Sequence, residues 1–409
     1  MQRADVGAAT CPQYTRRHAA CREVGAVGLG FPVMDADIHC VEPDDLWLSY
    51  LEPAFRDQAP RPRDAAGTMP GTFWVLDRPI ARLDLPERQE ASVHRRRRTQ
   101  QQFAERGRVG DTEEGGSPVA MLGAMDTEGI DLAVVYRTIA GHVIAFDDLP
   151  PPLAAAICRA YNNWLREYCD ADRARLLLAA LLPPHDIELA VVEARRAVHE
   201  LGAVALTLPS NPVKGRPWYH PAYDPLWAAA QDLDVTVAFH GIQVANQEHI
   251  GNRYLDNFVL MHAAGHPIEL MLALGAMLTG GVLERFPKLR LAFLEGHCGW
   301  APFWLDCLDE RWNSFGNDER FGLKLLPSEY FKRQCYLSVE PDESLTADVV
   351  RAIGDDSLVF STDWPHDDSL YPQALSTFLS LEGLSDQSRR KILWENCARL
   401  YKVGAPAAP

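Results

Sequence analysis

Aspartate, glutamate and histidine residues stand at or just after the ends of several short apolar runs in this 409-residue sequence. Such runs are typical of buried strands, so these polar side chains would lie at strand ends. Carboxylate and imidazole groups are the usual protein ligands of divalent transition metals. The pattern therefore predicts a metal-dependent active site. The candidate ligands are Asp37, His39, Glu42, His240, Glu295, His297 and Asp363.

Two pairs among these candidates have the same spacing. Asp37 and His39 form a D-x-H pair at the end of the first run, and Glu295 and His297 follow the sixth run two residues apart. Alternate residues of a strand project to the same face. We therefore expect the members of each pair to project together and to bind one ion.

The remaining candidates are single residues with ordinary alternative roles. His240 ends the fifth run and could be a hydrogen-bonded strand-end histidine, Asp363 follows the eighth and could cap a helix, and Glu42 could form a salt bridge. His262 and His266 are spaced i, i+4 without the acid of an H-E-x-x-H motif, so we expect them to be structural. What favours a metal is that the candidates end four separate strands.

The number of candidates exceeds the need of a single ion. One catalytic zinc uses about three protein ligands and keeps one position open. Either several candidates lie outside the coordination shell, or two metals bind. We expect one or two divalent ions per chain, zinc, iron or manganese, and a carboxylate-rich two-metal site would suit iron or manganese better than zinc.

Eight short apolar runs separated by helical patterns predict an α/β fold with a parallel sheet. The expected strands are residues 33–38, 130–136, 176–182, 202–208, 235–239, 289–294, 335–339 and 358–361. The expected helices are residues 153–168, 187–201, 225–233, 268–286 and 385–401. We expect a closed (β/α)8 TIM barrel, in which all strand ends meet at one rim. An open doubly wound sheet is the competing architecture, but no G-x-G-x-x-G motif follows the first strand.

Residues 53–118 contain no convincing strand–helix unit. We expect an insertion after the first strand, helical near residues 89–106, that forms a lid over the active-site face. Its four arginines, Arg95 to Arg98, would either form a solvated helix face or bind a carboxylate or phosphate of the substrate. Residues 1–30 are expected to be a loosely ordered extension and residues 404–409 a disordered tail, which leaves residues 31–403 for the barrel.

The composition excludes several classes of partner. With 40 Lys+Arg and 56 Asp+Glu the net charge is −16, which argues against nucleic acid. No signal peptide is visible and no apolar run reaches the roughly 18 residues that span a bilayer, so we expect no membrane segment. The nine cysteines include no C-x-x-C pair and are expected to be reduced thiols of a cytoplasmic protein.

Four segments in order resemble the amidohydrolase-related branch of the amidohydrolase superfamily, which includes aminocarboxymuconate semialdehyde decarboxylase and related aromatic-acid decarboxylases. They are MDADIHCVEPDDLW, PAYDPLWAAAQDLDVTVAFHG, GGVLERFPKLRLAFLEGHCGWAPFW and LVFSTDWPHDD. The resemblance covers about residues 34–400 and implies a metal-bearing barrel in which a homodimer is an expected assembly. It also implies that Asp37, His39, His240 and Asp363 are metal ligands.

The sequence departs from this family after the sixth strand. There the decarboxylases carry an H-x-G-[EG] motif with a catalytic histidine. Aligned on Pro302, that histidine falls at Gly296, and His297 is one residue away. A shift of one residue turns a side chain to the opposite face of a strand, unless the chain has already left the strand at this point. The departure argues against decarboxylation and places the carboxylate of Glu295 beside the expected metal.

The leading hypothesis is therefore a metal-dependent hydrolase that acts on an ester, thioester, lactone or amide through a metal-activated water. Asp363 would be the general base, His297 or His366 would stabilise the oxyanion, and Glu295 would complete the catalytic set.

Three alternatives stay open. The surplus of ligands would suit two non-haem irons and a monooxygenase of natural-product biosynthesis. A non-oxidative decarboxylase of an aromatic or unsaturated acid and a barrel that binds without catalysis are the other two. For every enzymatic alternative the expected partner is a small molecule that carries a carboxylate or a phosphate.

Overall fold

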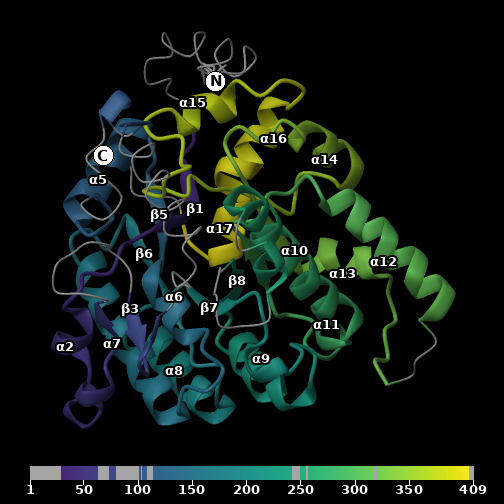
Figure 1. Ribbon diagram of the computed structural model, residues 1–409. Helices are drawn as coiled ribbons and strands as arrows, with labels where there is room; N and C mark the ends of the chain where they lie inside the picture. The colour runs from purple at the N-terminus through teal and green to yellow at the C-terminus, as the bar shows by residue number, and fades with distance from the viewer. Residues whose placement is uncertain are drawn as a thin grey trace, which may run out of the picture.

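The computed structural model describes residues 29–62, 73–79, 101–102, 104–107, 114–241, 249–254, 257–316 and 320–404. Its centre is a parallel sheet of eight strands, each paired with the next along the chain and curled into a barrel (Figure 1). The strands are β1 (Met34–His39), β5 (Leu132–Tyr136), β6 (Leu176–Leu181), β7 (Ala205–Pro209), β8 (Thr236–His240), β9 (Leu291–Leu294), β10 (Cys335–Val339) and β11 (Leu358–Phe360). The predicted (β/α)8 barrel and all eight of its strands are confirmed.

Helices surround the barrel on its outside (Figure 1). The longer ones are α5 (Pro118–Glu128), α7 (Pro151–Cys169), α8 (Ile187–His199), α9 (Asp224–Asp232), α10 (Phe258–Thr279), α12 (Ala301–Phe315), α13 (Pro327–Gln334) and α14 (Thr346–Ile353). The shorter ones are α2 (Leu46–Tyr50), α6 (Ile139–Ile144), α11 (Val282–Arg285), α15 (Ala374–Leu379), α16 (Asp386–Arg390) and α17 (Asn396–Tyr401). The predicted helix 268–286 is in fact α10 and α11, and α10 begins at Phe258 because the side chain of Asn257 caps its first turn.

Apolar side chains, several of them alanines, fill the inside of the barrel, and α17 closes the end at which the strands begin. The inward-facing residues include Met34 and Tyr136, together with one alanine from each of five strands. They are Ala36, Ala179, Ala205, Ala238 and Ala292. The hydroxyl of Tyr401 on α17 donates to the carbonyl oxygen of Ala36 at 2.8 Å and lies 3.0 Å from the hydroxyl of Tyr136. The charged side chains predicted to bind a metal lie at the opposite end, where the strands end.

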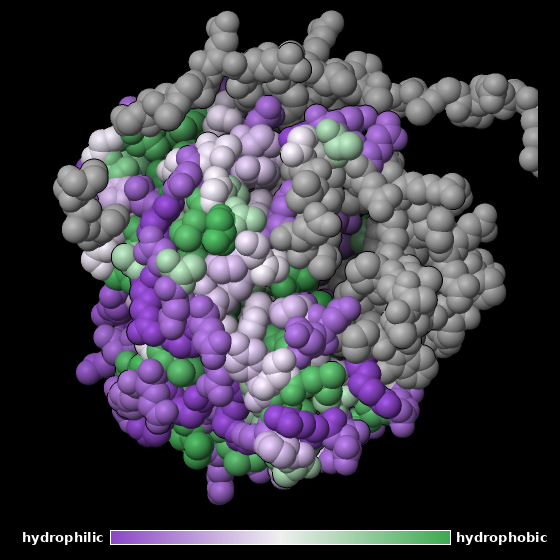
Figure 2. Space-filling model, turned by 90° about the vertical axis from the view of Figure 1, so that its left-hand side faces the viewer, coloured by the Kyte–Doolittle hydropathy of each residue, from purple (hydrophilic) through white to green (hydrophobic). Residues whose placement is uncertain are grey.

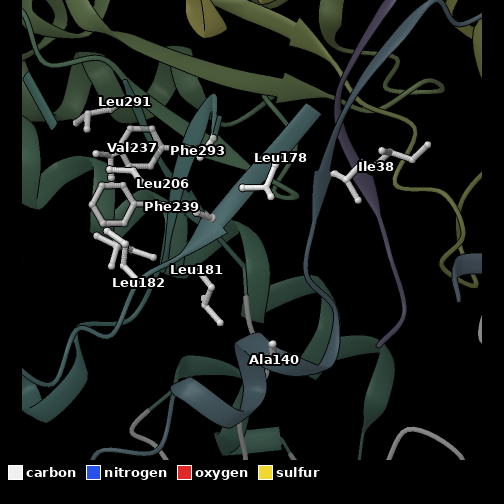
Figure 3. Close-up of a cluster of buried hydrophobic side chains, with 14 of the residues drawn as sticks. Ile38, Ala140, Leu178, Leu181, Leu182, Leu206, Val237, Phe239, Leu291 and Phe293 are labelled. Atoms are coloured by element: carbon white, nitrogen blue, oxygen red, sulfur yellow. The ribbon is translucent and has the colours of Figure 1, made fainter. Parts of the chain in front are cut away.

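Large side chains pack between the strands and the helices. Figure 3 shows Phe239 of β8 and Phe293 of β9 side by side, with Leu206, Val237 and Leu291 around them. The two rings stack with their centroids 5.3 Å apart. Because strand residues alternate between the two faces, an outward Phe239 places the next residue, His240, inside the barrel.

The seam between β11 and β1 closes the barrel through loop and side-chain contacts. His39 N donates to the carbonyl oxygen of Trp364 at 2.7 Å. One carboxylate oxygen of Asp35, which is fully buried, accepts from Asp37 N at 3.0 Å and from Thr362 N at 3.2 Å, and the other accepts from the Thr362 hydroxyl. Burial raises the pKa of Asp35 to about 7. Asp35 thus ties together the two chain segments that carry the predicted metal ligands.

A shift in the register of β1 changes the direction of its side chains. The pairing with β5 is irregular between Asp35 and Ile38. Met34 and Ala36 face the barrel interior, whereas Ile38 faces the helices. The irregularity therefore adds one residue to the alternation, as a β-bulge does, and turns Asp37 and His39 inward.

The predicted insertion contains a small antiparallel sheet, β2 (Arg61–Pro62), β3 (Phe73–Val75) and β4 (Arg78–Pro79), which the sequence did not indicate. Its described parts touch the loops at the mouth of the barrel. Arg106 donates to the carbonyl oxygen of Ser369 after β11, and Val41 N, after β1, donates to the carbonyl oxygen of Gly115 at 3.0 Å. The role of a lid stays a prediction, and the four arginines, residues 1–28 and residues 405–409 lie outside the described residues.

One helix corrects the expectation about apolar length. By its length and composition alone, α10 is long and apolar enough to cross a membrane. It packs against β8, β9, α12 and α13 as a helix of the barrel, and it carries His262, His266 and Glu269. The face in Figure 2 shows hydrophobic groups separated by hydrophilic residues, which is typical of amphipathic helices around a barrel. The cytoplasmic location stays a prediction.

Replacing Asp35 tests how much its hydrogen bonds between β1 and the loop after β11 stabilise the fold. In Asp35→Ala the buried N–H groups of Asp37 and Thr362 lose their acceptor, so we expect the free energy of unfolding to fall by about 2–4 kcal/mol. Asp35→Asn keeps an oxygen for both N–H groups and should cost less than about 1 kcal/mol. Urea unfolding followed by circular dichroism measures both, and equal losses in the two variants would contradict the role of these hydrogen bonds.

Candidate metal centre and active site

Four of the predicted ligands converge inside the mouth of the barrel. Asp37 and His39 end β1, His240 ends β8, and Asp363 lies in the loop after β11. His240 Nε2 is 3.2 Å from both His39 Nε2 and Asp37 Oδ1. His39 Nε2 is 3.4 Å from Asp37 Oδ1 and 3.4 Å from Asp363 Oδ1. These residues are buried, so the cluster is shielded from bulk water.

The two histidines direct unprotonated nitrogens at each other. His39 Nδ1 lies 2.9 Å from the carbonyl oxygen of Arg137, and His240 Nδ1 lies 3.1 Å from that of Gly241. A carbonyl oxygen only accepts, so each Nδ1 carries a proton, and in the neutral imidazole that ligates a metal each Nε2 then presents a lone pair. Two lone pairs 3.2 Å apart beside a carboxylate repel one another unless a cation lies between them. Asp37 Oδ2 is buried and has no hydrogen-bond partner among the described residues, which leaves it free to ligate.

The protonation states of this cluster suit a divalent cation. Burial and the charge of His366 lower the pKa of His39 to about 4, so its imidazole is neutral at neutral pH. Burial opposes ionisation of Asp37, but His240 and His39 hold the pKa of that carboxyl well below its usual range. Metal ligation requires a neutral imidazole and an ionised carboxylate. The site therefore has the donors and the charges of a divalent metal centre.

A proton is held beside the cluster by Asp363 and His366. The hydroxyl of Thr138 donates to the carbonyl oxygen of Cys40 at 2.8 Å, so at 3.1 Å it accepts from His366 Nε2. His366 Nδ1 lies 2.7 Å from Asp363 Oδ1, a distance that requires a shared proton. Burial opposes the charge, but Asp363 raises the pKa of His366 to about 10. The pair thus keeps one proton at neutral pH.

Glu295 reaches the cluster from the outer side of His240. It follows β9 directly with φ = 59°, a left-handed conformation that redirects its side chain although the preceding Leu294 already faces the interior. Glu295 Oε2 lies 3.2 Å from His240 Nδ1, and Oε1 lies 3.0 Å from His266 Nδ1. Burial opposes its charge, but His266 and His240 hold the pKa of Glu295 well below its usual range. Its carboxylate contacts the nitrogen of His240 that faces away from the other ligands.

His297 does not join Glu295, and the prediction that the two project together is wrong. The strand ends at Leu294 and both residues adopt φ = 59°, so strand alternation no longer applies. The side chain of His297 is 56% exposed and its Nδ1 lies 3.9 Å from Glu343. A Cβ at Gly296 would lie 2.3 Å from Cδ1 of Leu270 on α10, so a histidine there would have to displace the end of that leucine.

Glu42 is also outside the cluster. Its two carboxylate oxygens accept from the backbone N–H groups of Ile139 at 2.7 Å and Ala140 at 2.9 Å. These N–H groups belong to the first turn of α6, where a carboxylate is favourable. The structure therefore gives Glu42 the role of orienting α6 behind the site.

Sequence reasoning missed Arg137 and His266, as well as Thr138, whose hydroxyl contacts His366. Arg137 is buried, follows β5 directly, and its carbonyl oxygen orients His39. Its position at a strand end is the same signal that indicated His240, so the sequence could have revealed it. His266, which was expected to be structural, contacts Glu295, and its ring stacks on His262. Its position depends on the packing of α10, which no local pattern shows.

Comparison with known proteins now identifies the family. A family model described as Amidohydrolase matches residues 35–403. The chain belongs to this family. A structure with the same fold is an amidohydrolase from Mycobacterium avium subsp. paratuberculosis, with a TM-score of 0.72, 22% identity and coverage of 92% of this chain and 100% of the other. These findings confirm the predicted family.

Curated relatives correct the expected reaction. Gamma-resorcylate decarboxylase of Rhizobium sp. (strain MTP-10005) is 27% identical over 69% of this chain and 86% of its own length. A 5-carboxyvanillate decarboxylase structure from Novosphingobium aromaticivorans, with a TM-score of 0.67 and 16% identity, covers 92% of this chain and 98% of the other. The leading hypothesis of a hydrolase is therefore wrong, and these relatives do not support a monooxygenase.

Removing one proposed ligand tests which histidine binds the metal, His240 of the cluster or the exposed His297. In the wild type, Mn²⁺ at 100 times its dissociation constant should raise the free energy of unfolding by about 2.7 kcal/mol. His240→Ala removes a central donor and should abolish this gain. His297→Ala changes an exposed residue outside the cluster and should retain it. Urea unfolding with and without Mn²⁺ decides, and an equal gain in His240→Ala would contradict the assignment.

Proposed function

We propose that this protein is a metal-dependent, non-oxidative decarboxylase of a small aromatic acid that carries a hydroxyl group next to the carboxylate. The relatives that support this substrate class are decarboxylases of resorcylate and carboxyvanillate. The observation that carries the reaction is the shared proton of Asp363 and His366 beside the metal cluster. Decarboxylation needs one proton at the carbon that loses carbon dioxide, and it needs no oxidant.

The proposed ligands of the ion are Asp37, His39, His240 and Asp363. Manganese is bound in the structures of the 5-carboxyvanillate decarboxylase and of a dihydroxybenzoic acid decarboxylase from Polaromonas. A divalent ion held here would supply positive charge to the carboxylate and hydroxyl oxygens of the substrate.

The chain itself supplies the proton. In the proposed step the proton shared by His366 Nδ1 and Asp363 Oδ1 moves to the ring carbon that bears the carboxylate. The bond from this carbon to the carboxylate then breaks, and its electron pair returns to the ring as carbon dioxide leaves. Thr138 fixes the ring of His366 at Nε2, which keeps Nδ1 directed at Asp363. Solvent restores the proton after the product leaves.

Replacing His366 tests the proton source separately from the metal. His366→Gln can still donate to Thr138 but holds no transferable proton, so we expect turnover to fall by roughly 10²–10⁴-fold. The manganese content should be unchanged. The assay is carbon dioxide release from a panel of ortho-hydroxybenzoates by the manganese-loaded enzyme, with His297→Gln as control. Wild-type turnover in His366→Gln, or no carbon dioxide from any acid of the panel, would contradict the proposal.

A further inference from the structure

We infer that Glu295 is a positioning residue that orients His240 for metal binding, and that His266 from α10 holds Glu295 in place. The inference rests on the metal site of the proposed function and deepens it. It concerns the chain's own contacts around that site. It assigns a role to the carboxylate–imidazole pair that the proposed reaction does not use.

The first step is the contact between Glu295 and His240. Glu295 Oε2 lies 3.2 Å from His240 Nδ1, the nitrogen opposite the one that faces Asp37 and His39. A carboxylate on the outer nitrogen of a metal-binding histidine fixes its tautomer and ring orientation and increases the basicity of the ligating nitrogen. The other acceptor of this nitrogen is the neutral carbonyl oxygen of Gly241 at 3.1 Å. Within the part of the chain that the structure describes, Glu295 alone adds a negative charge at this nitrogen.

The second step is how Glu295 is held. Its backbone N–H donates to the Ser338 hydroxyl at 3.0 Å, which fixes the chain where it turns after β9. Its Oε1 lies 3.0 Å from His266 Nδ1. The ring of His266 stacks on His262 with centroids 5.0 Å apart and an angle of 19° between the planes. Glu295 is therefore fixed from the backbone and from the far end of its side chain.

The third step is how α10 reaches the site. A Cβ on Gly241 would lie 2.6 Å from His266 Nδ1, and a Cβ on Gly296 would lie 2.3 Å from Leu270. His266 and Leu270 are four residues apart and so lie on one face of α10. The two glycines immediately follow His240 and Glu295. The missing side chains allow the helix to approach both strand ends and to bring His266 to Glu295.

The test measures metal binding without substrate. Metal-free wild type, Glu295→Gln, His266→Gln and the double variant are titrated with Mn²⁺ in competition with a chelator, and the visible spectrum of each Co²⁺ form is recorded. Glu295→Gln should weaken Mn²⁺ binding by about 10–100-fold and shift the Co²⁺ bands. His266→Gln should weaken it less. The double variant should bind as Glu295→Gln does, because both changes act through one contact.

The matched control is Glu128→Gln, the same change at a partly buried carboxylate that accepts from the backbone N–H groups of Ala374 and Leu375. It should bind Mn²⁺ as the wild type does. Wild-type affinity and spectrum in Glu295→Gln, or losses that multiply in the double variant, would overturn the inference. If Glu295→Gln does not fold, His266→Gln decides alone, and its unchanged affinity and spectrum would overturn it. The decarboxylation assay is independent, so either proposal can fail while the other stands.

Discussion

The arrangement of the whole site depends on two imidazoles that, as metal ligands, turn their Nε2 lone pairs toward each other beside a buried carboxylate. His39 Nε2 and His240 Nε2 are 3.2 Å apart, and backbone carbonyls fix both tautomers from behind. In a dry interior such lone pairs are unfavourable without a positive partner. Two features of the fold place these groups: α17 closes the end of the barrel at which the strands begin, and the irregularity in β1 turns Asp37 and His39 inward.

Much of this arrangement could be predicted from the sequence, because the signals are local. Apolar runs of four to seven residues marked every strand, and polar residues at their ends marked Asp37, His39, His240 and Asp363. Barrel closure then brings distant strand ends together. The directions of Glu295 and His297 could not be predicted in this way. They depend on the left-handed backbone of both residues after β9, and no strand pattern shows where the chain turns in this way.

The expected reaction was wrong for a related reason. On a strand, His297 would face away from the position of the family histidine, and with no histidine at Gly296 the sequence argues against decarboxylation unless the chain leaves the strand there. In the structure the segment has left the strand, and an imidazole is available from elsewhere in the chain. A residue type at one aligned position is weak evidence for a reaction when the proton it would supply can come from a neighbouring loop.

The site is best understood as one alternating chain of imidazoles and carboxylates. Each neighbouring pair lies between 2.7 and 3.4 Å apart. In order, the chain is His366, Asp363, His39, Asp37, His240, Glu295 and His266. Every carboxylate has an imidazole on each side, so a change in the charge of one member alters the protonation of its neighbours. The metal ligands lie in the middle of this chain. Its two ends, His366 and His266, belong to a loop and to a helix, which strand patterns do not describe. Substitutions at the two ends should therefore be coupled through the ligands rather than additive, although the residues are one hundred positions apart in the sequence.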